Sequence, residues 1–95
     1  MEVIDCLVVP DEKSEIVKKL LHFSDQRQAD LIFTTGGTGF SKRDVTPEAT
    51  KQVVEREVPG IGEALRSYSM TITPKAMLSR QTAGIRGNTL IINLP

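Results

Sequence analysis

Three glycines lie within residues 36–39, in the stretch Thr-Thr-Gly-Gly-Thr-Gly (34–39) that follows the apolar run Leu31-Ile32-Phe33. Glycine lacks a Cβ atom, so such a stretch lets the chain turn sharply and brings backbone N–H groups close to an anionic ligand. A glycine-rich turn alone serves structure as often as binding. The spacing here matches neither a P-loop, which needs a following Lys-Ser or Lys-Thr pair, nor a dinucleotide fingerprint. The stretch therefore predicts a strand that ends in a phosphate-binding loop of another type.

The composition indicates one small globular unit. The chain has 95 residues, 39% of them hydrophobic, and its 12 basic and 12 acidic residues give a formal net charge of +0. A chain of this size buries about two-thirds of its unfolded surface, so a modest core is expected. Balanced charge gives no electrostatic reason to expect nucleic acid or an anionic membrane as partner. The single cysteine fits the cytoplasm, and no apolar run approaches the roughly 20 residues of a membrane span.

The pattern of apolar residues predicts an alternation of strands and helices. Residues 3–9 form a β-branched, nearly continuous apolar run, which is typical of a strand covered on both faces. From Ser14 onward, apolar residues recur at helical spacing up to Phe23. A second buried strand is expected over 31–35. Strand, helix and strand in this order predict a right-handed crossover and a parallel pair, with the glycine loop at the carboxyl edge, where open parallel sheets bind ligands.

The second half of the chain adds helices and a strand pair. Thr46-Pro47-Glu48 predicts a helix start with Thr46 as the cap, and this helix is expected to run to about Glu57. The further expected elements are a helix after Gly60, a short helical turn from Thr73-Pro74, and strands over 82–86 and 89–94 around Gly87-Asn88. The whole pattern predicts an α/β fold with three αβα layers around a mostly parallel sheet.

Two acidic residues follow the two expected parallel strands. Asp11 comes directly after 3–9 and Asp44 after the glycine loop, so both carboxylates are expected at one edge of the sheet. Carboxylates in such a place suit Mg²⁺ or acid/base chemistry. The structural alternatives are that Asp11 begins the first helix and that Asp44 is a turn residue. Arg80 is a further candidate, because a guanidinium donates to phosphate in a forked pattern; pairing with a helix C-terminus or a neighbouring subunit is its alternative.

Seven segments together carry a family resemblance that covers nearly the whole chain. They are Val9-Pro10-Asp11, residues 34–39, Arg43-Asp44-Val45-Thr46-Pro47-Glu48-Ala49-Thr50, Pro59-Gly60, Met77-Leu78-Ser79-Arg80, Gly84-Ile85-Arg86-Gly87 and Leu90-Ile91-Ile92-Asn93-Leu94-Pro95. The chain resembles the molybdenum-cofactor biosynthesis domains of bacterial MogA and MoaB and of the G domain of gephyrin. It is most similar to the molybdopterin adenylyltransferase branch. Related domains of the competence-damage-inducible type carry a Gly-Gly-Leu-Gly loop and a paired Asp, where this chain has Thr38 and Arg43.

The resemblance implies an enzyme that joins AMP from Mg-ATP to the terminal phosphate of molybdopterin, working as a cytoplasmic homotrimer. It implies Mg²⁺, with ATP and molybdopterin as substrates, and Asp11 and Asp44 as catalytic and Mg²⁺-binding residues. The implied substrate-binding and phosphate-binding residues are Thr35, Gly36, Gly37, Thr38, Gly39, Thr46, Glu48, Ser79 and Arg80. Two alternatives stay open: a non-catalytic molybdopterin-binding or trimeric scaffolding module, and a MoaB-like protein.

The chain also departs from the family pattern at its ends. Complete family members begin with a further strand and a Ser-Asp loop, and they continue past the last strand into another loop and a long helix. Residues 1–95 are therefore expected to be a partial molybdopterin-binding domain, truncated at both ends. The expected consequences are an unpaired sheet edge and exposure of Leu90 and Ile92 on one face. Fusion to a second cofactor-synthesis domain, and the choice of molybdenum or tungsten, stay open.

Overall fold

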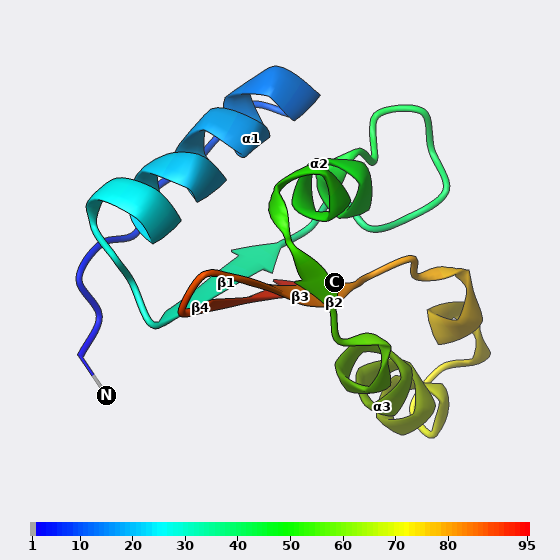
Figure 1. Ribbon diagram of the computed structural model, residues 1–95. Helices are drawn as coiled ribbons and strands as arrows, with labels where there is room; N and C mark the ends of the chain where they lie inside the picture. Colours follow the sequence, from blue (N-terminus) through cyan, green and yellow to red (C-terminus); the bar gives the residue numbers. More distant parts are fainter. Residues whose placement is uncertain (1) are drawn as a thin grey trace.

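A mixed four-stranded sheet lies in the middle of the computed structural model, which describes residues 2–95 (Figure 1). Its strands are β1 (Leu31–Thr35), β4 (Thr89–Leu94), β3 (Ala83–Arg86) and β2 (Arg56–Glu57), in that spatial order. β1 pairs with β4 in parallel, whereas β4 with β3 and β3 with β2 are antiparallel. The sheet of the described residues is therefore mixed, and the expected predominance of parallel pairing is not found.

Helices cover both faces of this sheet. α1 (Lys13–Leu21) continues into a π-helical turn, η1 (His22–Gln26), and lies with α2 (Thr46–Val53) on one face (Figure 1). α3 (Pro59–Met70) and the 3₁₀ helix η2 (Pro74–Leu78) lie on the other face. This arrangement confirms the predicted α/β fold with three layers. In the described part of the chain, no helix is long and apolar enough to cross a membrane.

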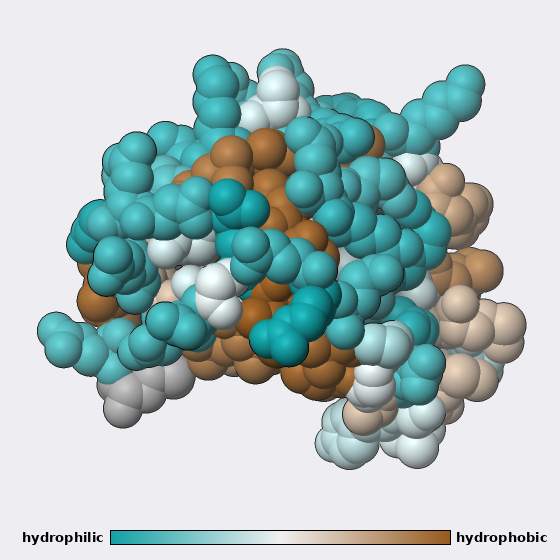
Figure 2. Space-filling view, viewed as in Figure 1, coloured by the Kyte–Doolittle hydropathy of each residue, from teal (hydrophilic) through white to brown (hydrophobic). Residues whose placement is uncertain are grey.

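The core lies between α1, α2 and the sheet. Leu20, Val53 and Ile91 are 4%, 3% and 0% exposed and pack together, as the helical spacing of apolar residues in α1 predicts. Burial alternates along β4, so that its residues at 89, 91 and 93 are buried and those at 90, 92 and 94 are half-buried. Leu90 and Ile92 are thus only partly covered on the α3 side. Apolar surface also shows in the seam between α1 and α2 and along the edge near η2 (Figure 2).

The prediction of a first strand over residues 3–9 is wrong. Residues 2–10 form no strand, and no described strand pairs with them. Val3 and Val8 are 76% and 98% exposed. A β-branched run fits a pleated surface, but it becomes a strand only where a neighbour completes the hydrogen-bond ladder. Within the described residues, β1 is an edge strand, so the expected unpaired edge is present and the expected parallel pair with residues 3–9 is not.

The helix that begins at Thr46 ends earlier than expected, at Val53 instead of about Glu57. The chain turns extended at Val54, and the N–H groups of Glu55 and Val58 donate to carbonyls of β3 at 2.8 Å each. Pairing with β3 therefore replaces the last helical turn. The cap prediction is also wrong: Val45 occupies the N-cap position without a side-chain cap, and Thr46 is the first helical residue.

The remaining elements confirm the sequence-based predictions. α3 begins at Pro59, and η2 begins after Thr73, whose hydroxyl accepts a hydrogen bond from the Lys75 N–H at 3.4 Å. β3 and β4 form a hairpin around Gly87-Asn88. Gly87 has φ +55, and a type II′ turn needs such a residue at its first central position.

Candidate functional site

The glycine loop leaves the carboxyl end of β1, as predicted. The N–H of Gly36 donates to the Leu94 carbonyl at 3.0 Å, which extends the β1–β4 ladder by one bond. Gly36 and Gly37 have φ values of +81 and +68, in the left-handed region that favours glycine. The Thr46 N–H then donates to the Gly37 carbonyl at 3.1 Å. The loop therefore turns sharply after the sheet and closes on the first residue of α2.

Consecutive backbone donors of this loop have no partner in the described part of the chain. The N–H of Gly36 is used in the sheet, but those of Gly37, Thr38 and Gly39 meet no acceptor among residues 2–95. Successive unpaired N–H groups at a turn form a concave site with partial positive charge, which suits an anion. The loop thus keeps the donors that a phosphate needs.

The two candidate carboxylates have different partners. Asp44 Oδ2 accepts a hydrogen bond from the Ser41 N–H at 3.0 Å, and Asp11 Oδ2 lies 3.9 Å from an Arg43 Nη atom. Asp11 therefore reaches the glycine loop, although no strand precedes it and α1 supplies its position instead. The side chains of Arg43 and Asp11 are 84% and 56% exposed, so this ion pair adds little stability.

The carboxylates suit Mg²⁺ by their chemistry. Asp44 Oδ1 meets no donor among the described residues, and both carboxylates are oxygen ligands of the kind that Mg²⁺ prefers. No group of three His, Cys, Asp or Glu side chains gathers for a metal within residues 2–95. Mg²⁺ commonly uses one or two carboxylates together with substrate phosphates, so Asp11 and Asp44 fit that pattern.

Arg80 and Glu48 face each other beside the loop. Arg80 Nη1 donates to a Glu48 carboxylate oxygen, and this hydrogen bond lowers the pKa of Glu48 below its ordinary value, while partial burial opposes the shift. Arg80 Nε donates to the Gly39 carbonyl at 2.7 Å. Both predicted residues therefore lie at the site, but their side chains bind the protein itself.

An open cleft of about 360 Å³ lies next to this loop. Polar groups line one side: the Ser79 hydroxyl donates to Gln81 Oε1 at 2.9 Å and lies 3.5 Å from the Thr38 hydroxyl oxygen. Gln81 is 2% exposed, and its Nε2 has no hydrogen-bond partner among the described residues. A buried donor without a partner costs about 1–3 kcal/mol. The Gln81 amide is therefore a candidate donor to a ligand in this cleft, once the side chain turns toward it.

Sequence reasoning missed Gln81. A signal for it existed, because residues two apart on an extended segment point to the same side, and Gln81 is two residues after Ser79. Phe40 and Lys75 also line the cleft and were not predicted. Their side chains belong to a loop and to η2, whose approach cannot be seen from local patterns.

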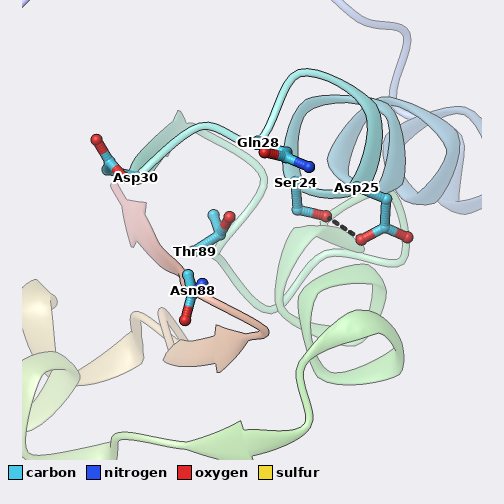
Figure 3. A pocket seen from close by; sticks show the side chains of 6 residues that line it. All are labelled: Ser24, Asp25, Gln28, Asp30, Asn88 and Thr89. Carbon is cyan, nitrogen blue, oxygen red and sulfur yellow. Dashed lines mark hydrogen bonds between the residues drawn. The ribbon is translucent and has the colours of Figure 1, made fainter.

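A second cavity, of about 320 Å³, lies at the opposite edge of the sheet (Figure 3). Its lining residues are Ser24, Asp25, Gln28, Asp30, Asn88 and Thr89. The Ser24 hydroxyl donates to Asp25 Oδ1 at 3.0 Å, and hydrogen bonding to Arg86 lowers the pKa of Asp25. None of the predicted site residues lines this cavity, so we take the cleft beside the glycine loop as the candidate functional site.

The predicted residues therefore separate into three groups. Thr38, Gly39 and Ser79 line the cleft directly. Those that form, close or hold the loop are Thr35, Gly36, Gly37, Asp44, Thr46, Glu48 and Arg80. Asp11 reaches the loop only through Arg43.

Comparison with known proteins shows the family of this chain. A family model described as "Probable molybdopterin binding domain" matches residues 1–95. The chain is 53% identical over 88 residues to a molybdopterin adenylyltransferase of Helicobacter pylori strain J99, covering 93% of this chain and 50% of the relative. It is 46% identical over 92 residues to that of Escherichia coli strain K12, covering 97% and 47%.

A solved structure shows the same fold. The molybdopterin biosynthesis enzyme MoaB from Thermus thermophilus superposes with a TM-score of 0.92 at 51% identity, covering 99% of this chain and 59% of that one. The chain thus spans about half the length of the curated relatives it matches.

Proposed function

Because the chain belongs to the family of probable molybdopterin binding domains of molybdenum cofactor biosynthesis, we propose that it is the part of a molybdopterin adenylyltransferase that holds the phosphates. The proposed whole protein transfers AMP from ATP to the terminal phosphate of molybdopterin. The similarity to adenylyltransferases that are twice as long supports this activity for the whole protein. Residues 1–95 would then be a partial domain, working in the cytoplasm.

One observation carries the proposal: the N–H groups of Gly37, Thr38 and Gly39 lie beside a cleft with the buried amide of Gln81, and none of these donors has a partner within residues 2–95. Three donors in a row suit phosphate oxygens, and the polar and apolar walls of the cleft suit an organic group attached to the phosphate. The combination favours a phosphorylated organic substrate over a free inorganic ion.

The proposed reaction requires little covalent chemistry from the protein. A phosphate oxygen of molybdopterin attacks the α-phosphorus of ATP, a new P–O bond forms, the bond to the β-phosphate bridging oxygen breaks, and pyrophosphate leaves. Catalysis then depends on alignment and on neutralising the phosphate charge. Thr35 to Gly39, Thr46 and Ser79 would align the phosphates through the loop and cleft, with Glu48 and Arg80 beside them.

Asp11 and Asp44 would hold Mg²⁺. When bound, Mg²⁺ supplies positive charge that offsets the charge of the transferring phosphate. Asp44 is the better placed of the two, because the turn at Ser41 fixes its carboxylate against the loop.

Substitution of Asp44 tests the proposal. Calorimetric titration with molybdopterin and then Mg-ATP should show binding and pyrophosphate release in the natural protein. Asp44→Asn should lower turnover by at least about 100-fold, because the charge that holds Mg²⁺ is lost. Asp30→Asn, in the cavity at the opposite edge, is the matched control and should turn over normally. Normal turnover in Asp44→Asn would contradict the catalytic proposal.

A MoaB-like role is the second candidate, favoured by the high similarity to the Thermus thermophilus structure of that name. A non-catalytic molybdopterin-binding or trimeric scaffolding module is a further reading. Both predict molybdopterin binding without pyrophosphate release. We also propose a homotrimer, for which analytical ultracentrifugation should give the mass of three chains. Asp44→Asn should sediment like the natural protein whichever role is correct.

A further inference from the structure

The short segment between η2 and β3 lies across the glycine loop and holds it through one residue, Arg80. Its backbone N–H donates to the Thr38 carbonyl and its Nε to the Gly39 carbonyl, both at 2.7 Å. Its Nη2 donates to the Asp44 carbonyl, and its Nη1 to the Glu48 carboxylate. Arg80 thus connects the last two residues of the glycine loop, the segment before α2 and the first turn of α2.

The held carbonyls decide where the neighbouring N–H groups point. A peptide unit is planar and trans, so its C=O and the N–H of the next residue point in opposite directions. With the carbonyls of Thr38 and Gly39 turned toward Arg80, the N–H groups of Gly39 and Phe40 are turned away from it. Neither N–H group meets an acceptor among residues 2–95. The backbone N–H of Arg80 therefore orients the Gly39 donor of the candidate phosphate site, and its guanidinium orients the Phe40 donor next to it.

The charge of Arg80 is already matched inside the protein. Glu48 accepts from its Nη1, and the side chains of Arg80 and Glu48 are 39% and 43% exposed. Hydrogen bonding to Arg80 lowers the pKa of Glu48, which favours the ionised carboxylate beside the guanidinium. All three nitrogen atoms of the guanidinium, Nε, Nη1 and Nη2, donate to acceptors of the protein itself. The guanidinium therefore does not offer the cleft the paired donors that a phosphate ligand would accept.

We propose that Arg80 is a positioning residue, which orients the N–H groups of Gly39 and Phe40 toward a phosphate group and does not itself contact that phosphate. The proposal rests on the proposed function only for the source of the phosphate. Glu48 fixes the guanidinium plane and acts through Arg80.

Nuclear magnetic resonance of the loop amides in the full-length natural protein tests this role. Inorganic pyrophosphate is the probe. In the natural protein, the amide proton signals of Gly39 and Phe40 should move downfield on binding, because charge-assisted hydrogen bonds form. In Arg80→Gln the shift of Phe40 should be lost at saturation, because the bond from Nε to the Gly39 carbonyl is gone, and the dissociation constant should rise about ten-fold. The shift of Gly39 should remain, because the backbone N–H of residue 80 still holds the Thr38 carbonyl. Arg80→Lys should respond in the same way, because it keeps the charge without the fork.

Arg86→Gln is the matched control. Arg86 donates through Nε and Nη2 to Asp25 and through Nη1 to the Val53 carbonyl, each at 2.9 Å, far from the loop. This variant loses a similar set of bonds, so a general loss of stability appears in both variants. Only the Arg80 variants should lose the shift of Phe40.

Glu48→Gln separates positioning from direct contact. It leaves the charge of Arg80 unmatched, so a direct contact predicts equal or tighter pyrophosphate binding. Positioning predicts weaker binding, because the fork is no longer fixed, and a Glu48→Gln/Arg80→Gln double variant should bind no more weakly than Arg80→Gln alone. Glu48→Gln also decides the case if Arg80→Gln does not fold.

Three results would overturn the inference: equal or tighter binding in Glu48→Gln, a natural shift of Phe40 in Arg80→Gln or Arg80→Lys, or no shift of the Gly39 and Phe40 signals in the natural protein. The outcome is independent of adenylyl transfer. A protein that orients its loop through Arg80 but releases no pyrophosphate from ATP would refute the proposed function and leave the inference standing.

Discussion

Residue by residue, the glycines of the loop differ in what they are needed for. Gly36 and Gly37 share a left-handed backbone, but a Cβ atom would meet nothing within 4 Å at Gly36, whereas at Gly37 it would lie 2.3 Å from the Thr46 hydroxyl oxygen. Gly39 has an ordinary φ, but a Cβ there would lie 2.8 Å from Asp44 Oδ2. Gly36 is therefore needed for its backbone conformation, Gly39 for the space that a Cβ would fill, and Gly37 for both reasons.

Alanine substitutions should separate these needs. Gly36→Ala is expected to lower the free energy of unfolding by about 1–2 kcal/mol, the cost of a left-handed residue. Gly37→Ala should cost at least about 1 kcal/mol more, because Thr46 must also move. Gly60→Ala, where a Cβ meets nothing and φ is ordinary, is the matched control and should not destabilise. Urea unfolding measures all three, and equal losses for Gly36→Ala and Gly37→Ala would contradict the predicted clash.

The pair of Glu48 and Arg80 predicts a pH dependence of stability. Because the pKa of Glu48 is lower in the folded protein than in the unfolded chain, its contribution is full above the ordinary value of 4.5 and is lost as the pH falls through the folded pKa. The free energy of unfolding should therefore fall less steeply below about pH 5 in Glu48→Gln than in the natural protein. Glu63→Gln, on the exposed surface of α3, should keep the natural slope in urea titrations at several pH values.

Between elements, a buried polar network joins β1, β4 and α2 beneath the glycine loop. Asn93 is fully buried in β4, and its Nδ2 lies 2.9 Å from both the Thr34 and the Thr50 hydroxyl oxygens. Its Oδ1 accepts from the Thr82 N–H at 3.3 Å. These bonds set the start of the loop relative to the helix that follows it, so the network supports the site without lining it.

Asn93→Ala should therefore be costly. It leaves the hydroxyls and one backbone N–H without a partner in a buried place, for which we expect a loss of about 2–4 kcal/mol in urea unfolding. Asn88→Ala, in the exposed hairpin turn, is the matched control, with an expected change within about 0.5 kcal/mol. A loss as small as the control's would show that water replaces the network.

At the scale of the whole molecule, the buried hydrophobic cluster of residues 2–95 lies on one face of the sheet. Leu20, Val53 and Ile91 form the buried cluster, whereas Phe33 is 50% exposed on the other face of β1. Domains of this size have about 5–15 kcal/mol of stability in total, and their cores are small. A single core substitution should therefore affect the entire fold.

Ile91→Ala is expected to lower the free energy of unfolding by about 2–5 kcal/mol and to leave a substantial fraction unfolded at 37 °C. Leu90→Ala, the neighbouring residue on the half-buried face of β4, should cost clearly less. Thermal unfolding followed by circular dichroism compares the two. Equal losses would mean that the α3 face is as well covered as the α1 face.

Local patterns were sufficient for most elements. The spacing of apolar residues predicted α1, the apolar run before the glycines predicted β1, and Gly87-Asn88 predicted the hairpin, because each depends on contacts within a few residues. Residues 3–9 and the end of α2 were predicted wrongly. Both depend on a partner strand: none pairs with 3–9 in the described residues, and β3 captures the chain after Val53.

The sequence by itself determined the position of the loop, the type of fold and the candidate residues from Thr35 to Arg80. Only the tertiary structure decided what these residues touch. It paired Arg80 with Glu48 and with carbonyls of the loop, left Gln81 Nε2 without a partner among residues 2–95 and brought Asp11 to the loop through Arg43. The physical reason is range: turn chemistry and periodicity act over a few residues, whereas Arg80 lies 41 residues from Gly39 along the chain and meets it only in the folded protein, in which η2 packs against α3.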